Sequence, residues 1–382
     1  MTTVFEHARK LDANGEVDDF WMLVDADTIT ATGHGAAPTA LVTAADSRVD
    51  VGGQWLVPGF IDLHCHGGGG FSFEDGSEAI LGALATHRAH GTTRSVISLV
   101  TNPLPELCSS LAMIADLCDA DPLILGSHVE GPFLEMEHRG AHNPDFLRDP
   151  QPEVIGELLA AARGTLRHMT IAPDLVNALE CVDVLVEAGV VVAVGHTNAT
   201  FEQAQAAFGR GARMLTHAFN AMPGIHHRAP GPVVAALEDD RIVLELVLDG
   251  VHVHPDVAAL TFSSAPGRVA VVTDAMAAAG SADGDYQLGS LAVTVTNGQA
   301  VLRGTTTIAS STLTMDNALR IAMESVGLSP SAAVEALTLA PAKALGLEKR
   351  FGLLAEGFAA DAVVLDHRWA VTGVWGAGAQ LR

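Results

Sequence analysis

Residues 56–67, LVPGFIDLHCHG, form a short apolar run that leads directly into the histidine pair His64 and His66. The chain repeats this arrangement, since each apolar run is followed by a polar turn and then by a segment with helical periodicity. The eight apolar runs cover residues 56–63, 93–100, 123–125, 169–172, 190–194, 214–216, 242–248 and 269–273. Because these runs do not alternate with polar residues, they are typical of parallel strands that are covered on both faces.

Eight such units within residues 55–350 predict an α/β fold, namely a (β/α)8 TIM-like barrel, with a doubly wound open sheet as the alternative. The segments between the runs have the spacing of helices that cover a sheet. In residues 152–164, PEVIGELLAAARG, apolar side chains recur on one helical face and the pattern stops at Gly164. Residues 55–350 are therefore predicted to be the barrel.

The two ends of the chain differ from this pattern, because they read as short strands and turns. We expect residues 1–54 and 351–382 to form together a small β-sandwich domain. Residues 286–302 alternate apolar with small or polar side chains, and Asn297-Gly298 is a strong hairpin turn. The sequence thus predicts a β-hairpin inserted into the barrel near residues 286–302.

Composition limits the classes of function. The chain of 382 residues is 48% hydrophobic and 17% charged, which is typical of a folded globular protein. Its 45 acidic and 21 basic residues give a formal net charge of −24, which disfavours nucleic acid and anionic membranes as partners. The first residues lack a signal peptide's apolar segment, and the four cysteines suggest neither a disulfide framework nor a metal site. We therefore expect a cytoplasmic protein.

Ionisable side chains gather at the ends of the predicted strands: His64, His66, His128, Glu130, His196, His217, Asp249, His252, His254 and Asp274. The carboxyl ends of barrel strands meet at one mouth, where active sites are built. A single histidine there is more often structural, and a His-x-His pair alone fits either role. Buried ionisable groups are costly unless they are paired or bound to metal, so the whole set favours a metal site.

Two imidazoles and a carboxylate, with one position left open, are typical of a hydrolytic zinc site. The metal lowers the pKa of its water from about 16 towards about 7 and so supplies hydroxide near neutral pH. The sequence thus predicts a metal-dependent hydrolase.

Several motifs resemble the amidohydrolase superfamily and, within it, the N-acetylglucosamine-6-phosphate deacetylase branch. In chain order they are PGFIDLHCHG, HVEGPFLE, HRGAHNP, VGHTNAT, THAFNAMPGIHHRAPG, LDGVHVHP, VTDAM, STLTMDNAL, LTLAPAKALGL and GFAADAVVLD. The resemblance implies hydrolysis of the acetamide of N-acetylglucosamine 6-phosphate to glucosamine 6-phosphate and acetate, with metal-bound hydroxide as the nucleophile. It covers nearly the whole chain.

The resemblance also implies a divalent metal, with zinc expected. Glu130, His196 and His217 match the family's principal ligands, and His64, His66 and Asp274 are further candidates. Some members of the family lack the histidine pair on the first strand and use one metal. Because this chain has the pair, and one glutamate can bridge two cations, we favour a site for two metals over a site for one.

Asp274 matches the catalytic aspartate of the family, which acts first as general base and then as general acid. His142 matches a histidine that contacts substrate and is expected to orient the acetamide or to stabilise charge on its oxygen. His128 is expected to support the carboxylate of Glu130 from behind, and a role as a metal ligand is the alternative.

The residues that the resemblance assigns to substrate binding are His142, Asn220, Ala221, His227, Arg228, His252 and Ile308. The segment His226-His227-Arg228 is a local basic cluster in an acidic chain, and arginine grips phosphate through two donors. The alternative is a solvated loop that happens to be basic. In the family the matching arginine reaches into the neighbouring subunit's site, so the resemblance implies a homodimer.

One departure from the family concerns the acyl pocket, where the usual Leu-Ala-Gly-Ser reads Ile308-Ala309-Ser310-Ser311. A serine in place of that glycine could narrow or re-aim the loop. Two rival functions remain, namely another amidohydrolase such as a cyclic amidase or deaminase, and a non-catalytic barrel. Another amidohydrolase should lack the two segments that we assign to phosphate binding, Phe219-Asn220-Ala221-Met222 and His226-His227-Arg228. A non-catalytic barrel should have lost metal ligands or the aspartate of the last strand. This chain retains the phosphate segments, the candidate ligands and the aspartate.

Overall fold

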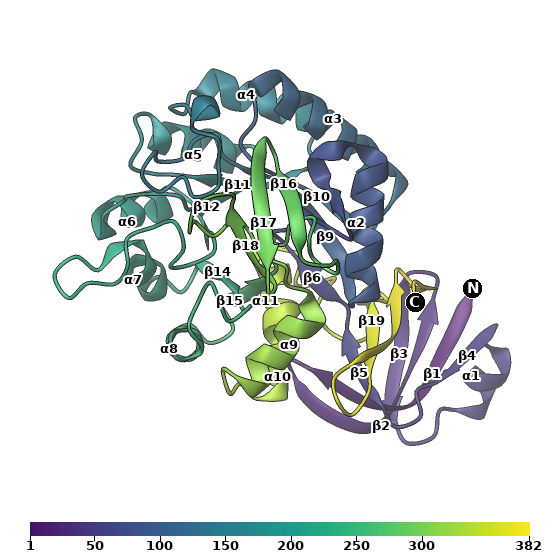
Figure 1. Ribbon diagram of the computed structural model, residues 1–382. Coiled ribbons are helices and arrows are strands. Elements are labelled where there is room, and N and C mark those ends of the chain that lie inside the picture. Colours follow the sequence, from purple (N-terminus) through teal and green to yellow (C-terminus); the bar gives the residue numbers. More distant parts are fainter.

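A computed structural model describes all 382 residues, and Figure 1 shows a barrel of strands and helices with a smaller sheet beside it, where both termini lie. The barrel sheet contains eight parallel strands in the order β15-β14-β13-β12-β11-β10-β9-β6. Their bounds are β6 (Phe60–Asp62), β9 (Thr92–Leu99), β10 (Ile124–Glu130), β11 (Leu166–Ile171), β12 (Val191–Val194), β13 (Met214–Leu215), β14 (Val243–Val247) and β15 (Val269–Val272). The predicted eight-stranded barrel is confirmed.

The first and last strands of this sheet, β6 and β15, do not pair directly in the sheet and are joined by bonds that involve the residues following them, including Thr273, which donates to the carboxylate of Asp62. The backbone N–H of Asp274 donates to the carbonyl of His64 at 2.8 Å, and the N–H of His66 donates to the carbonyl of Ala275 at 2.8 Å. The chain immediately beyond the strands therefore closes the barrel at its carboxyl end.

Helices surround the barrel: α2 (Ser77–Ala89), α3 (Leu104–Ala120), α4 (Pro152–Ala162), α5 (Ala178–Glu187), α6 (Phe201–Gly209), α7 (Gly231–Glu238), α8 (Pro255–Ser264), α9 (Met315–Glu324), α10 (Pro330–Leu337) and α11 (Leu339–Ala344). The helix predicted over 152–164 is α4, which ends where Arg163 adopts a left-handed backbone with φ of 50°. None of the helices has both the length and the apolar character that crossing a membrane requires.

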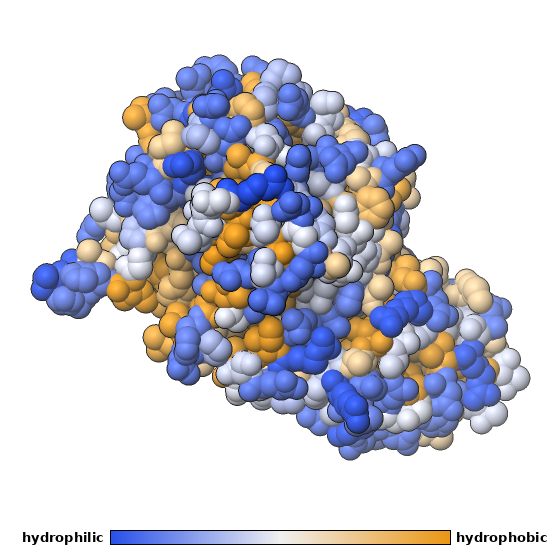
Figure 2. Space-filling view, viewed as in Figure 1, coloured by the Kyte–Doolittle hydropathy of each residue, from blue (hydrophilic) through white to orange (hydrophobic).

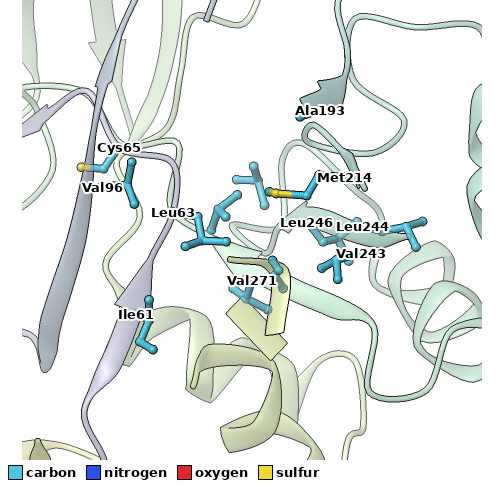
Figure 3. Close-up of a cluster of buried hydrophobic side chains, with 14 of the residues drawn as sticks. Ile61, Leu63, Cys65, Val96, Ala193, Met214, Val243, Leu244, Leu246 and Val271 are labelled. Carbon is cyan, nitrogen blue, oxygen red and sulfur yellow. The ribbon is translucent and has the colours of Figure 1, made fainter. Parts of the chain in front are cut away.

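Burial explains the unbroken apolar runs. Every residue of β9, β10, β14 and β15 is buried between the barrel interior and the helices. Figure 3 shows Val96, Leu246 and Val271, which come from three of these strands and are fully buried. Each such side chain contributes about 1.5–3 kcal/mol relative to an exposed position, so the core stabilises a rigid frame for the strand ends.

The second sheet joins both ends of the chain. Its eight strands are β1 (Thr2–Asp12), β2 (Gly15–Asp25), β3 (Thr28–His34), β4 (Ser47–Asp50), β5 (Trp55–Pro58), β19 (Ala362–Leu365), β20 (Val371–Gly376) and β21 (Ala379–Gln380). The helix α1 (Thr39–Ala44) lies between β3 and β4. A separate β domain from both ends is thus present, although its strands are hydrogen-bonded into one sheet rather than two separate layers.

The run 56–63, predicted as one strand, forms two strands that are separated at Gly59. Strand β5 pairs antiparallel with β19 in the terminal sheet, so this sheet extends past the boundary predicted at residue 54, whereas β6 enters the barrel. A Cβ atom on Gly59 would lie 2.1 Å from the Thr93 hydroxyl oxygen, so only glycine permits this close passage between the two sheets.

The inserted segment is a three-stranded antiparallel sheet, and the expected hairpin is part of it. Its strands are β16 (Gly284–Leu288), β17 (Leu291–Thr296) and β18 (Gln299–Leu302). The Asn297-Gly298 turn joins β17 to β18 with φ values of 51° and 75°, as a two-residue hairpin turn requires. Strand β16 was not predicted as a separate strand, because only its last residue is buried and it therefore has no clear alternation of apolar and polar side chains. Two further short strands, β7 (Gly67–Gly68) and β8 (Phe71–Ser72), follow the first barrel strand.

A buried ion pair ties the barrel to the terminal sheet. Arg94 lies in β9, and its Nε and Nη2 atoms donate to the two carboxylate oxygens of Asp361 at 2.7 and 3.0 Å. Both residues are at most 6% exposed. A paired charge of this kind is tolerated only while its partner remains in place.

Asp361→Asn should lower the stability by about 3–5 kcal/mol, because it leaves the buried Arg94 guanidinium without its counter-charge. Chemical denaturation followed by circular dichroism measures the change. Asp116→Asn is the matched control, since Asp116 pairs with Arg163 at the surface, and it should leave the denaturation midpoint almost unchanged. Equal shifts for the two variants would show that the Arg94 pair does not stabilise the junction.

Candidate active site

Three strand ends bring Glu130, His196 and His217 into contact. Glu130 is the last residue of β10, and the two histidines lie two residues beyond β12 and β13. The Nε2 atoms of His196 and His217 lie 3.0 and 3.1 Å from Glu130 Oε1 and 3.0 Å from each other. The three side chains that sequence analysis named as principal ligands therefore converge on one point.

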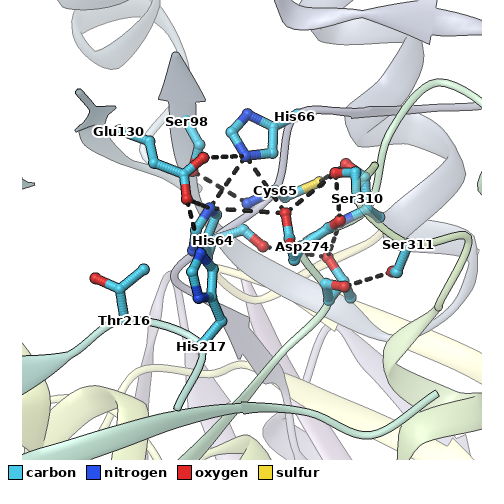
Figure 4. Close-up of polar contacts among 12 residues, drawn as sticks. His64, Cys65, His66, Ser98, Glu130, Thr216, His217, Asp274, Ser310 and Ser311 are labelled. Carbon is cyan, nitrogen blue, oxygen red and sulfur yellow. Dashed lines mark hydrogen bonds and ion pairs between the residues drawn. The ribbon is translucent and has the colours of Figure 1, made fainter. Parts of the chain in front are cut away.

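The histidine pair of the first strand completes the cluster from the other side of Glu130. The Nε2 atoms of His64 and His66 are 3.0 Å apart, and they lie 3.4 and 3.2 Å from the two oxygens of Glu130. Asp274 Oδ1 lies 3.7 Å from His64 Nε2 and 3.5 Å from His66 Nε2. Figure 4 shows Glu130 and Asp274 on opposite sides of this pair. All six candidate ligands are thus in one cluster.

The backbone at three of these residues is in the left-handed region, with φ of 46° at His196, 24° at His217 and 47° at Asp274. This conformation costs an L-residue of the order of 1 kcal/mol or more, so the surrounding structure must impose it. Each residue lies two positions beyond the end of a strand, and strain of this kind concentrates at functional sites.

The charges in the cluster depend strongly on one another. Burial opposes the charged form of Glu130, yet the charge of His64 and hydrogen bonds from His142, His196 and His217 hold its pKa well below the usual value. Burial also opposes a charged His66, but hydrogen bonds to Asp274 and Glu130, together with the charge of Glu130, raise its pKa to about 10. Burial lowers the pKa of His196 to about 4. The two buried carboxylates therefore require positive charge between them.

This arrangement fits a divalent cation. Pairs of Nε2 atoms face each other at 3.0 Å, and at that distance each pair has either an unfavourable contact or a proton to share. Imidazole and carboxylate groups together are the ligands that zinc prefers, and a cation would offset both buried negative charges. The groups His64, His66 and Glu130, and Glu130, His142 and His196, each hold their donor atoms within 4.8 Å of one another.

Two groups outside the cluster orient its histidines. His64 Nδ1–H donates to Glu245 Oε2 at 3.2 Å, and His196 Nδ1–H donates to the carbonyl of His138 at 2.9 Å. Each contact leaves Nε2 free to face the cluster. Sequence analysis missed Glu245, although an acidic residue inside the apolar run 242–248 was a signal that could have identified it.

His128 does not support Glu130, contrary to the expectation. Its Nδ1 lies 2.9 Å from Ser98 Oγ, its Nε2 lies 2.9 Å from Thr170 Oγ1, and its ring stacks on His168 at 3.8 Å. Burial and the neighbouring His168 keep its pKa well below the ordinary value, so the ring is neutral. His128 lies on the same face of β10 as Glu130, and its ring packs edge-on against the ring of His64 at 4.6 Å, in the barrel interior.

The cluster opens into a pocket with a volume of about 360 Å³. Its wall contains five of the predicted substrate residues, namely His142, Asn220, Ala221, His252 and Ile308. His142 Nε2 lies 3.4 Å from Glu130 Oε2, and His252 Nδ1–H donates to Asp249 Oδ2 at 2.6 Å. Sequence analysis did not name Val100, Glu137, Leu288, Thr306 and Thr307, which also line the pocket and come from loops and the inserted sheet.

His227 and Arg228 lie outside this pocket, in the exposed loop that leads into α7. Their side chains contact each other, with Arg228 Nη1 at 2.7 Å from His227 Nε2. Figures 1 and 2 show that this loop projects from the barrel and carries hydrophilic side chains at its tip. Within one chain, therefore, the basic cluster does not reach the site.

The chain resembles characterised proteins over nearly its full length. It is 36% identical to the N-acetylgalactosamine-6-phosphate deacetylase of Escherichia coli O157:H7 over 98% of each chain. It is 37% identical to the N-acetylglucosamine-6-phosphate deacetylase of Danio rerio, covering 88% of this chain and 87% of that one.

The fold matches solved structures equally well. A variant of N-acetyl-D-glucosamine-6-phosphate deacetylase from Mycobacterium smegmatis, in complex with N-acetyl-D-glucosamine-6-phosphate, is 43% identical with a TM-score of 0.93. This match covers 100% of this chain and 99% of that chain. The pattern of the amidohydrolase family matches residues 55–379, which include every residue of the cluster. The chain belongs to the amidohydrolase family.

Proposed function

We propose that this protein hydrolyses the acetamide of N-acetylglucosamine 6-phosphate to glucosamine 6-phosphate and acetate. The observation that carries the proposal is the facing pair of Glu130 and Asp274, with four histidine Nε2 atoms between and beside them, at the base of a pocket. Relatives and neighbours that carry the deacetylase name support the choice of reaction.

A divalent metal, which we expect to be zinc, would be held by Glu130, His196 and His217, and a second by His64 and His66 with Glu130 shared. Such a cation lowers the pKa of a water molecule and polarises an amide carbonyl. Asp274 lies beside both histidines of the second group and is available to either set.

Asp274 is the proton carrier in this proposal. Burial opposes its ionised form, but the charge of His64 and a hydrogen bond from His66 keep its pKa below the usual value, so it is ionised and can accept a proton at neutral pH. It takes a proton from the attacking water and returns it to the amine nitrogen, which leaves as the C–N bond breaks. His142 lies across Glu130 Oε2 and orients the acetamide or stabilises charge on its oxygen.

The phosphate end of the substrate requires positive charge. Within the chain, His252 faces the pocket, and its hydrogen bond with Asp249 outweighs burial and raises its pKa above the ordinary value. The backbone amide of Ala221 would supply a further donor, and Ile308 would pack near the substrate. Asn220 would have to release its present bonds to the carbonyls of His217 and Ala218 before it could donate to phosphate. We propose a homodimer in which His227 and Arg228 extend into the neighbouring pocket, because their loop projects away from its own.

A second substrate is favoured by one observation. The Escherichia coli relative that matches 98% of each chain carries the name N-acetylgalactosamine-6-phosphate deacetylase. The two sugars differ only in the configuration at C4, and the acetamide and the phosphate are the same. Acetate release from both sugar phosphates, measured side by side, decides between them.

We also propose that the enzyme works in the cytoplasm. Cys65, Cys108, Cys118 and Cys181 are all free thiols, which is typical of a reducing compartment.

Asp274→Asn should lower acetate release from N-acetylglucosamine 6-phosphate by about 10²-fold or more, because the amide cannot accept the proton. Metal content and the circular dichroism spectrum should remain those of the wild type. Turnover near the wild-type rate would overturn the assignment of Asp274, and a wild type that releases no acetate would overturn the proposed function.

Arg228→Ala should raise the KM for the phosphorylated sugar by about ten- to a hundredfold, because a charged donor to phosphate is lost. The KM for N-acetylglucosamine should change little, and Arg163→Ala, at an exposed site in the helix α4 terminus, is the control. Mixed dimers of Arg228→Ala with Asp274→Asn contain one complete site and should recover activity. Hybrid dimers without recovery would show that Arg228 does not act across the interface.

Zinc-loaded protein, after gel filtration, should carry more than one metal per chain. The double variant His64→Gln with His66→Asn should carry one, because Glu130, His196 and His217 remain. His254→Gln is the control, since His254 is exposed and outside the cluster, and it should keep the wild-type stoichiometry. A wild-type value that stays at one under excess zinc would reject the second metal.

A further inference from the structure

Ser310 differs from the other residues of the pocket wall, because its hydroxyl contacts one residue twice. Ser310 Oγ lies 2.7 Å from the backbone carbonyl oxygen of Asp274 and 3.1 Å from its carboxylate oxygen Oδ1. Figure 4 shows Ser310 on the side of Asp274 away from Glu130. The hydroxyl therefore bridges the backbone carbonyl and the carboxylate of Asp274, and it restrains the rotation of that side chain.

No other group is as close to this carboxylate oxygen. The Nε2 atoms of His66 and His64 are 3.5 and 3.7 Å from Oδ1. The backbone of Asp274 is fixed separately, because its N–H donates to His64 and its carbonyl accepts from the N–H of Ser311 at 2.8 Å. The backbone of Asp274 is thus held without the Ser310 side chain. What the Ser310 hydroxyl restrains is the rotation of the Asp274 carboxylate.

The conformation of Ser310 is costly for a serine. Its φ is 65°, in the left-handed region where glycine fits without strain. The backbone N–H of Met276 donates to Ser311, so the segment would keep its place with a glycine at 310. A side chain at a strained position with nothing to gain for the backbone indicates that the hydroxyl serves the neighbouring carboxylate.

We infer that Ser310 is a positioning residue that holds the Asp274 carboxylate towards the metal cluster during hydrolysis. The inference rests on the proposed function. The Ser310 hydroxyl lies within hydrogen-bond distance of both the backbone carbonyl and Oδ1 of Asp274, so it limits the rotation of the carboxylate. Ser310 itself gives up no proton, and the proton on Asp274 passes to the leaving amine.

The test compares Ser310→Ala and Ser310→Gly with the wild type on N-acetylglucosamine 6-phosphate. Both variants should lose about tenfold in kcat, the ratio that corresponds to 1.4 kcal/mol, with little change in KM, because the binding groups remain. Ser310→Gly should have a melting temperature equal to or above that of the wild type, since the strain at φ of 65° is relieved. A lower kcat together with undiminished stability is a combination that a purely structural serine would not give.

Ser331→Ala is the matched control. Ser331 Oγ donates to the backbone carbonyl of Asp12 at 2.7 Å, the same kind of bond at the same length, but in α10 and far from the pocket. It should lower the melting temperature and leave kcat unchanged. If the wild type is active and both Ser310 variants keep its kcat, the inference is wrong; if the wild type is inactive, the proposed function fails first.

Discussion

The hydrogen bond from the N–H of Asp274 to the carbonyl of His64 joins the first and last strands of the barrel, and the site depends on it. Strands β6 and β15 do not pair along their lengths, so the sheet is closed by the residues that follow them. The same residues carry the imidazole and carboxylate of the cluster. The same hydrogen bond therefore closes the barrel and places Asp274 beside the histidine pair. The packed core of the barrel keeps these residues in position.

The energetic problem of this site is its buried charge. Glu130, Asp274 and Glu245 are carboxylates at most 8% exposed, and an isolated buried charge costs several kcal/mol. Histidines on neighbouring strands offset this cost through direct contacts, as with Glu245 and His64. A cation in the cluster would supply the same compensation with more charge at shorter range. Each buried charge would be unfavourable alone, but the carboxylates and histidines together compensate one another. This explains why so many ionisable residues gather at one end of the barrel.

The barrel was predictable from the sequence, and the candidate ligands could be named, because both leave local patterns. Buried parallel strands require continuous apolar runs, and each ligand directly follows such a run, as His196 and His217 do. Other features depend on contacts between distant segments. The roles of Glu245 and of His128, and the division of the first run at Gly59, are decided by packing against β6, β11 and Thr93. A pattern within one segment does not contain that information.

The substrate and the protein have charge of the same sign, and this limits how binding can occur. A chain with a net charge of −24 repels a sugar phosphate at long range, so recognition must come from short-range positive groups. Inside one chain the pocket is lined by His252, which is paired with Asp249, by His138, and by histidines of the cluster. The exposed Arg228 of the projecting loop does not line the pocket of its own chain. In the homodimer that we propose, the Arg228 loop of the second chain would bring positive charge to the phosphate end of the pocket.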